Sequence, residues 1–159
     1  VHDIGKINIP TDILSKPGRL GQMERDLVRT HSESGYVILK DIELPWPLAD
    51  IVYQHHERLD GSGYPRGLKA PEILLEAQIL AVADMVEAIT WDRPYRPALG
   101  IDFALQEIRR LAGPALNRDV VDICGELIES GSFAFSETSD RFRLPDREGP
   151  RQGTLFPPN

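Results

Sequence analysis

The chain has 159 residues, enough for one domain with a single apolar core and too few for a second domain of ordinary size. Its net charge of −7 and isoelectric point of about 5.1 exclude the basic footprint of a protein that coats nucleic acid, so we expect no DNA partner. The one cysteine, Cys124, excludes a disulfide framework and a cysteine-rich zinc site. The single cysteine and the lack of an apolar run long enough to span a membrane together favour a cytoplasmic location.

The first part of the chain is predicted to be a loop followed by a helix. Residues 7–20 contain two prolines and a Lys-Pro-Gly turn, which favour loop. A helix is predicted from 21 to about 40, with Gly21 and Glu24 as its N-terminal cap. Helical spacing predicts that its inward stripe consists of Met23, Leu27, His31, Gly35 and Ile38.

The rest of the chain also has a helical pattern. After the Pro45 and Pro47 break, helices are predicted over the ranges 47–57, 71–90, 102–112 and 117–130. A glycine-rich loop, 58–70, separates the first two. Asn117 and Gly131 are the expected caps of the last helix. The sequence therefore predicts an all-α domain over residues 1–136 and, from its polar and proline-rich composition, a flexible tail over 137–159.

The positions of the histidines indicate a metal site. A lone histidine on an apolar face is more often a satisfied core residue, but here several signals coincide. His2 is followed by a carboxylate, His31 lies on a predicted buried stripe, and a further pair of histidines is adjacent in sequence. An aspartate also interrupts the apolar run ILAVADMVEAI, where an unpaired charge would cost several kcal/mol. The six candidate ligands are His2, Asp3, His31, His55, His56 and Asp84.

The chemistry of this set favours a catalytic centre with more than one ion. Imidazole and carboxylate ligands without thiolate suit Zn, Mn, Fe or Ni. Six ligands are too many for one ion that keeps an open position. They suit two ions about 3.5–4 Å apart, bridged by a carboxylate and a hydroxide. Asp3 is the expected bridge, because it adjoins His2 and has two oxygens.

Five segments together resemble the HD-GYP family of the HD phosphohydrolase superfamily over about residues 1–130. They are HDIGK at 2–6, the isolated His31, QHHERLDGSGYPRGL at 54–68, LAVADMVEAI at 80–89 and DRPYRPAL at 92–99. The resemblance implies an all-helical bundle of the HD type that hydrolyses cyclic di-GMP in bacterial signalling. It also implies two or three divalent metal ions, with Fe or Mn favoured and Ni, Zn or Mg as alternatives.

The resemblance also implies roles for particular residues. Asp3 and Lys6 would be catalytic, with Lys6 near the scissile phosphate, and the six candidate ligands would be the family's ligands. The implied substrate-binding residues are Lys6, Gly63, Tyr64, Pro65, Arg93 and Arg96. For Tyr64, stacking on a guanine and simple packing are both open.

The charged residues of the glycine-rich loop have less certain roles in the sequence. Glu57 and Asp60 could orient ligand histidines or cap the loop, while Arg58 and Arg66 are expected to be solvated.

The chain begins at the HD dyad, whereas family members carry earlier helices with a further metal-binding histidine. We therefore expect a bundle without its first helices, from a longer protein with an N-terminal sensory or receiver domain. Leu116, Asn117 and Arg118 stand where relatives usually have Phe-Asp-Pro.

Three functions are consistent with the sequence. The first is hydrolysis of cyclic di-GMP to pGpG, and onward to GMP. The second is an inactive module that binds cyclic di-GMP, or a partner such as a diguanylate cyclase domain through residues 61–67. The third is hydrolysis of another nucleotide at the same metal centre. Retention of all six ligands favours an enzyme, because a binding module does not need them.

Overall fold

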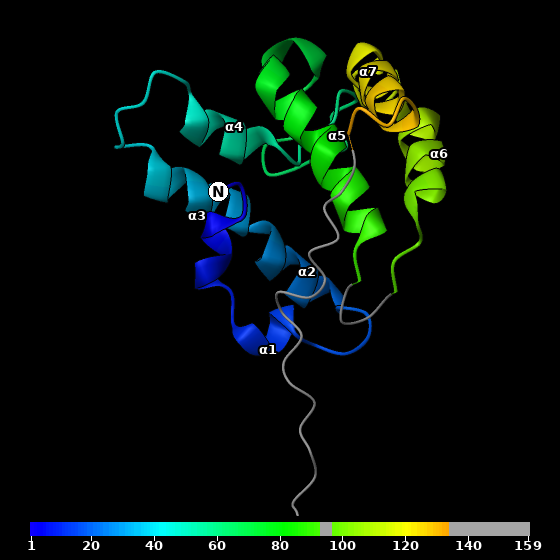
Figure 1. Cartoon of the computed structure of the whole chain (residues 1–159). Helices are drawn as coiled ribbons and strands as arrows, with labels where there is room; N and C mark the ends of the chain where they lie inside the picture. The colour runs from blue at the N-terminus through cyan, green and yellow to red at the C-terminus, as the bar shows by residue number, and fades with distance from the viewer. Residues whose placement is uncertain (93–96, 134–159) are drawn as a thin grey trace, which may run out of the picture.

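A computed structural model describes residues 1–92 and 97–133 of the chain, and in these ranges the regular elements are all helices (Figure 1). The only β-type pairings recorded there are two isolated bridges, Asp60 with Lys69 and Ala112 with Leu116. The predicted all-α class is therefore confirmed. The predicted tail and the two basic residues Arg93 and Arg96 lie outside the described residues.

The first half of the fold is a set of short helices. They are η1 (Ile4–Asn8), α1 (Thr11–Leu14), α2 (Gln22–Arg29), α3 (His31–Leu39) and α4 (Leu48–Gln54). η1 and α4 both pack against α3. The chain start, marked N in Figure 1, lies beside α3.

The prediction of one continuous helix over residues 21–40 is wrong. The helix divides at Thr30, whose backbone N–H and side-chain hydroxyl both donate to the Leu27 carbonyl, at 3.1 and 2.7 Å. A hydroxyl that competes for backbone partners in this way favours the end of a helix. The Gly21 cap is confirmed, because its N–H donates to the Glu24 carboxylate at 2.6 Å.

The division at Thr30 also changes which side chains are buried. Met23 is 88% exposed, and Leu27 and Ile38 are more than a third exposed, so these parts of the predicted stripe are wrong. His31 and Gly35 are buried as predicted. For Met23 and Leu27 the stripe failed because they lie on α2 and His31 and Gly35 lie on α3. Ile38 shares α3 with the two buried residues, so the division at Thr30 does not explain its exposure.

Close backbone packing brings the start of the chain to α3. A Cβ on Gly5 would overlap the backbone of His31 and reach the Gly35 nitrogen at 2.5 Å, and one on Gly35 would meet Val52 at 2.8 Å. Both positions therefore require glycine, since any larger residue would push η1 and α4 away from α3. This packing places residues 2 and 3 next to His31.

The second half of the fold contains the main apolar core. η2 (Ala70–Glu72) leads to α5 (Leu75–Thr90), which packs with α6 (Ile101–Leu111) and α7 (Arg118–Glu129). These three helices lie side by side in Figure 1. Their buried contacts centre on Val82, Ile108 and Val121, each at most 1% exposed. No helix in ranges 1–92 and 97–133 is both long and apolar enough to cross a membrane.

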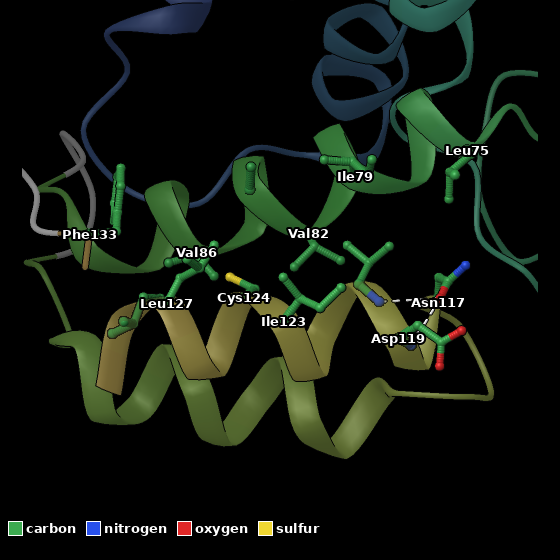
Figure 2. A pocket seen from close by; sticks show the side chains of 13 residues that line it. Leu75, Ile79, Val82, Val86, Asn117, Asp119, Ile123, Cys124, Leu127 and Phe133 are labelled. Carbon is green, nitrogen blue, oxygen red and sulfur yellow. Dashed lines mark hydrogen bonds between the residues drawn. The ribbon is translucent and has the colours of Figure 1, made fainter. Parts of the chain in front are cut away.

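A hydrophobic groove of about 510 Å³ separates the outer faces of α5 and α7 (Figure 2). Leu75 and Ile123, on its two walls, are each more than half exposed. Cys124 also lines the groove, and burial raises the pKa of its thiol. Cys124 is partly buried among these apolar side chains.

Asn117 caps α7 as predicted. Its side-chain oxygen accepts the N–H groups of Asp119 and Val120 at 3.0 and 3.3 Å, and its amide donates to Gln78 on α5. We expect Asn117→Ala to lower the free energy of unfolding by about 1–2 kcal/mol, measured by urea denaturation. Asn117→Asp, which retains the capping oxygen, should lose less, and equal losses would contradict the capping role.

Candidate metal centre

The structure brings the six candidate ligands together from four separate segments. His2 and Asp3 precede η1, His31 is the first residue of α3, and Asp84 lies in the middle of α5. His55 and His56 follow α4, which ends at Gln54 rather than at the predicted 57. We call these six residues the histidine–aspartate cluster.

Three imidazoles form the inner part of the cluster. Nε2 of His31 lies 3.5 Å from Nε2 of His55 and 3.2 Å from Nε2 of His56. One ligand atom of each residue lies within 4.8 Å of the others. His31 and His55 are at most 1% exposed, so these nitrogens are shielded from water.

The protonation of two of these rings is fixed by the backbone. Nδ1 of His31 lies 2.6 Å from the Val28 carbonyl, and Nδ1 of His55 lies 2.6 Å from the Val52 carbonyl. A carbonyl oxygen only accepts, so Nδ1 carries the hydrogen and Nε2 of each neutral ring carries a lone pair. These two nitrogens lie 3.5 Å apart and cannot hydrogen-bond to each other, because both are acceptors. A cation between them satisfies both, so the arrangement fits a metal ion.

The two carboxylates lie next to His2, His31 and His56. Asp3 lies 3.6 Å from His31 Nε2 through one oxygen and 3.6 Å from His2 Nε2 through the other. Asp84 lies 3.7 Å from His2 Nε2 and 3.9 Å from His56 Nδ1. Ligand atoms around one ion, each about 2.0–2.2 Å from it, stand about 3–4 Å apart. Each aspartate therefore spans two histidines at the separation that a shared ion requires.

Burial keeps the inner histidines neutral. It lowers the pKa of His55 to about 4 and that of His56 to about 2, and it lowers the pKa of His31 as well. Burial acts to raise the pKa of Asp3, but the hydrogen bond and the positive charge of Lys6 act against it, and this pKa is lowered. Neutral imidazoles and an ionised carboxylate are the states in which these groups bind metals.

Lys6 lies at the cluster as predicted. Its ammonium donates to Asp3 Oδ2 at 2.5 Å, and about a third of its side chain is exposed. The cation is therefore held at the edge of the cluster, where a bound anion could reach it.

The Gly63-Tyr64-Pro65 segment packs directly against the cluster. The Tyr64 N–H donates to the His56 carbonyl at 3.2 Å, and its ring stacks on the His56 ring with centroids 4.7 Å apart. A Cβ on Gly63 would reach the Cα of Glu57 and the His56 carbonyl at 2.5 Å, so this close approach requires glycine. Of the two roles left open for Tyr64, the structure shows packing on a cluster histidine.

Glu57 organises this loop, a role that sequence alone left undecided. It is 3% exposed, and its two carboxylate oxygens accept the N–H groups of Arg66 and Leu68 at 2.7 and 2.9 Å. Asp60 similarly accepts the N–H and hydroxyl of Ser62. Both acids therefore cap the loop. The signal in the sequence was that Glu57 directly follows the two adjacent histidines and directly precedes a glycine-rich loop. The backbone N–H groups of such a loop need buried acceptors.

Arg58 differs from its predicted solvated state. It is half-buried, and its guanidinium donates to the Glu57 carbonyl at 2.8 Å. Desolvation by burial lowers its pKa. Arg66 is exposed, as expected, with its guanidinium over the Tyr53 ring.

Comparison with known proteins places this site in a family. A family model described as HD domain matches residues 1–120. The chain is 44% identical over 124 residues to a cyclic di-GMP phosphodiesterase of Thermotoga maritima, covering 77% of this chain and 34% of that protein. It is 41% identical over 124 residues to the cyclic di-GMP phosphodiesterase response regulator RpfG of Xanthomonas campestris, covering 77% and 33%.

The name of a third relative gives a different substrate. The chain is 40% identical over 109 residues to 3'3'-cGAMP-specific phosphodiesterase 1 of Vibrio cholerae, covering 69% of this chain and 25% of that protein. The chain thus spans about a third of the length of the Thermotoga and Xanthomonas relatives and a quarter of that of the Vibrio relative. The matched region includes the segments that supply the cluster, and the chain belongs to the HD domain family as a member of its HD-GYP group.

Proposed function

We propose that this domain is a metal-dependent phosphodiesterase that hydrolyses cyclic di-GMP to pGpG, and onward to GMP, in bacterial second-messenger signalling. The observation that carries the proposal is the opposed Nε2 lone pairs of His31 and His55, 3.5 Å apart and closed to water. The names of the Thermotoga and Xanthomonas relatives supply the substrate. The proposed ligands are the histidine–aspartate cluster, holding two or three divalent ions, with Fe or Mn favoured over Ni, Zn and Mg.

When bound, such ions would activate water at neutral pH and neutralise charge on the phosphate. The protein's own groups have separate tasks. Asp3 is positioned between two histidines and can be shared by two ions. The ammonium of Lys6 would approach the non-bridging oxygens of the phosphodiester and stabilise the charge that develops there. Tyr64 and the loop around it exclude water from the side of His56.

Lys6 offers a test of this division of tasks. We expect Lys6→Met to lower kcat on cyclic di-GMP by roughly 100-fold, because one preorganised cation is removed from the transition state. Metal content should remain unchanged, since Lys6 is not a ligand. Lys16→Met is the matched control, because Lys16 pairs with Glu24 away from the cluster. An unchanged kcat for Lys6→Met would exclude the role.

The direct test of the function combines elemental analysis with product analysis on one sample. We expect at least two equivalents of Fe or Mn, and chromatography should show pGpG formed from cyclic di-GMP. A metal-free chain that binds cyclic di-GMP without cleaving it would instead identify the inactive binding module.

A second substrate is supported by a specific observation, the name of the Vibrio cholerae relative that is specific for 3'3'-cGAMP. The same assay should therefore include 3'3'-cGAMP beside cyclic di-GMP. The ratio of the two kcat/KM values assigns the preferred dinucleotide. The cluster fits either ligand, because both have the same kind of phosphodiester.

The regulatory context of the domain is also a proposal. The Xanthomonas relative is named as a response regulator, and the chain spans 33% of it. This supports an N-terminal sensory or receiver domain in the full-length protein. The loop over residues 61–67 would be the contact for a diguanylate cyclase domain. Co-purification of a cyclase domain with the chain, and its loss on changing exposed Arg66 to glutamate, would test that contact.

A further inference from the structure

We propose that Arg29 determines substrate specificity by binding the second phosphodiester of a cyclic dinucleotide, the one that is not being cleaved. This inference rests on the proposed function, because it assumes that the scissile phosphodiester lies at the histidine–aspartate cluster. It adds to that function a reason why the ligand would be a dinucleotide ring rather than any small phosphodiester.

Arg29 is the last residue of α2, a helix that supplies none of the cluster residues. Its guanidinium carbon lies over the ring of Tyr64, 5.0 Å from the ring centroid. Tyr64 is in turn stacked on His56, with centroids 4.7 Å apart. Arg29 therefore stands two ring contacts outward from a cluster histidine, at the rim of the site.

The state of the guanidinium suits a ligand contact. About half of the Arg29 side chain is exposed, and its recorded ion pair is with Asp26 at 3.6 Å, longer than a hydrogen bond. By contrast, Lys6 donates to Asp3, and Arg58 donates to a backbone carbonyl. A planar guanidinium over an aromatic ring keeps its N–H edge available, and that edge matches two oxygens of a phosphate.

The charges around the site indicate why a second cation is needed to bind a cyclic dinucleotide. The chain carries a net charge of −7, and the cluster contains two carboxylates. A cyclic dinucleotide carries two phosphodiester charges, of which one at a time can react. Lys6 is held beside Asp3, where it serves the reacting phosphate. Arg29, farther out and fixed over Tyr64, is placed to neutralise the other phosphate.

The test compares substrates with one and two phosphodiesters. We expect Arg29→Gln to raise KM roughly 10- to 100-fold for both cyclic di-GMP and 3'3'-cGAMP, the usual effect of losing a charged hydrogen bond. Its kcat and metal content should stay near those of the unaltered chain. For bis(p-nitrophenyl) phosphate, which has one phosphodiester and no base, KM should not change. Arg29→Lys should recover part of the loss.

Arg25→Gln is the matched control. Arg25 lies on the same helix and carries the same charge, but it is exposed and bonded to Leu20 and Gln22. Equal effects of the two substitutions would overturn the proposal in favour of general electrostatic attraction. A rise in KM for cyclic di-GMP alone would also overturn it, because it would indicate recognition of a base. A change with bis(p-nitrophenyl) phosphate would show that Arg29 acts on the reacting phosphate instead.

Direct binding separates this inference from the proposed function. If the unaltered chain cleaves neither dinucleotide, the proposed function fails. Titration of a fluorescent cyclic di-GMP analogue against the unaltered chain and Arg29→Gln still reports on Arg29. A weaker dissociation constant for Arg29→Gln alone supports the contact, and equal constants overturn it.

Discussion

Asp3→Ala should empty the metal centre and lower the turnover of cyclic di-GMP by about 1,000-fold or more, a loss of about 4 kcal/mol of transition-state stabilisation. The reason is geometric: Asp3 lies 3.6 Å from both His31 and His2, so its removal would take a proposed ligand oxygen from beside each histidine. Elemental analysis and product chromatography on the same preparation measure both effects.

Asp41→Ala is the control for this experiment, because Asp41 is an exposed carboxylate just beyond α3. It should retain full metal content and activity. Circular dichroism should show that Asp3→Ala keeps its helices, since Asp3 precedes η1 and is not part of the apolar core. If Asp3→Ala retained metal and turnover, the cluster would not be the catalytic centre.

Glu57→Gln should lower the free energy of unfolding by about 2–4 kcal/mol. The two oxygens of Glu57 accept the N–H groups of Arg66 and Leu68 inside the protein. Glutamine has nearly the same shape, but one of its terminal groups is a donor, so one buried N–H would face another donor. Each lost hydrogen bond to a charged group costs about 1.5–3 kcal/mol, and an unsatisfied donor adds to this. Chemical denaturation measures the change.

The same substitution should also reduce activity, because the loop that Glu57 holds carries Tyr64 onto His56. Asp60→Asn is the matched control. It makes the same chemical change on the same loop, but at an exposed site where water can replace the lost contact. If the two variants were equally stable, burial of Glu57 would not be what organises the loop.

Much of the candidate site could be predicted because its residues contradict their local surroundings. Asp84 interrupts an apolar helix, and two histidines are adjacent at 55 and 56. Polar groups in such positions need a partner, and the structure shows that they meet one another. Proximity could be inferred in this way, whereas the Nδ1 contacts to the Val28 and Val52 carbonyls could not, because they depend on the backbone of the preceding turn.

The failures have physical causes of a different kind. Predicting a buried stripe from helical spacing assumes that the helix is continuous. Here α2 ends at Thr30, whose hydroxyl donates to a backbone carbonyl, and no proline or glycine marks this boundary in the sequence. As a result the burial of Met23 and Leu27 was wrong, while that of His31, which begins the next helix, was right. Arg58 was expected to be solvated because arginine usually is, but it is half-buried and its guanidinium donates to a backbone carbonyl.

The residues of the histidine–aspartate cluster come from four segments of the backbone, and an ion held there would act as a cross-link among them. Such a link closes loops in the native chain that the unfolded chain leaves open. Metal occupancy and folding would then be one coupled equilibrium, in which stability grows with the logarithm of the free ion concentration. On this view a cell that withholds the metal would lower the stability of the domain along with its chemistry.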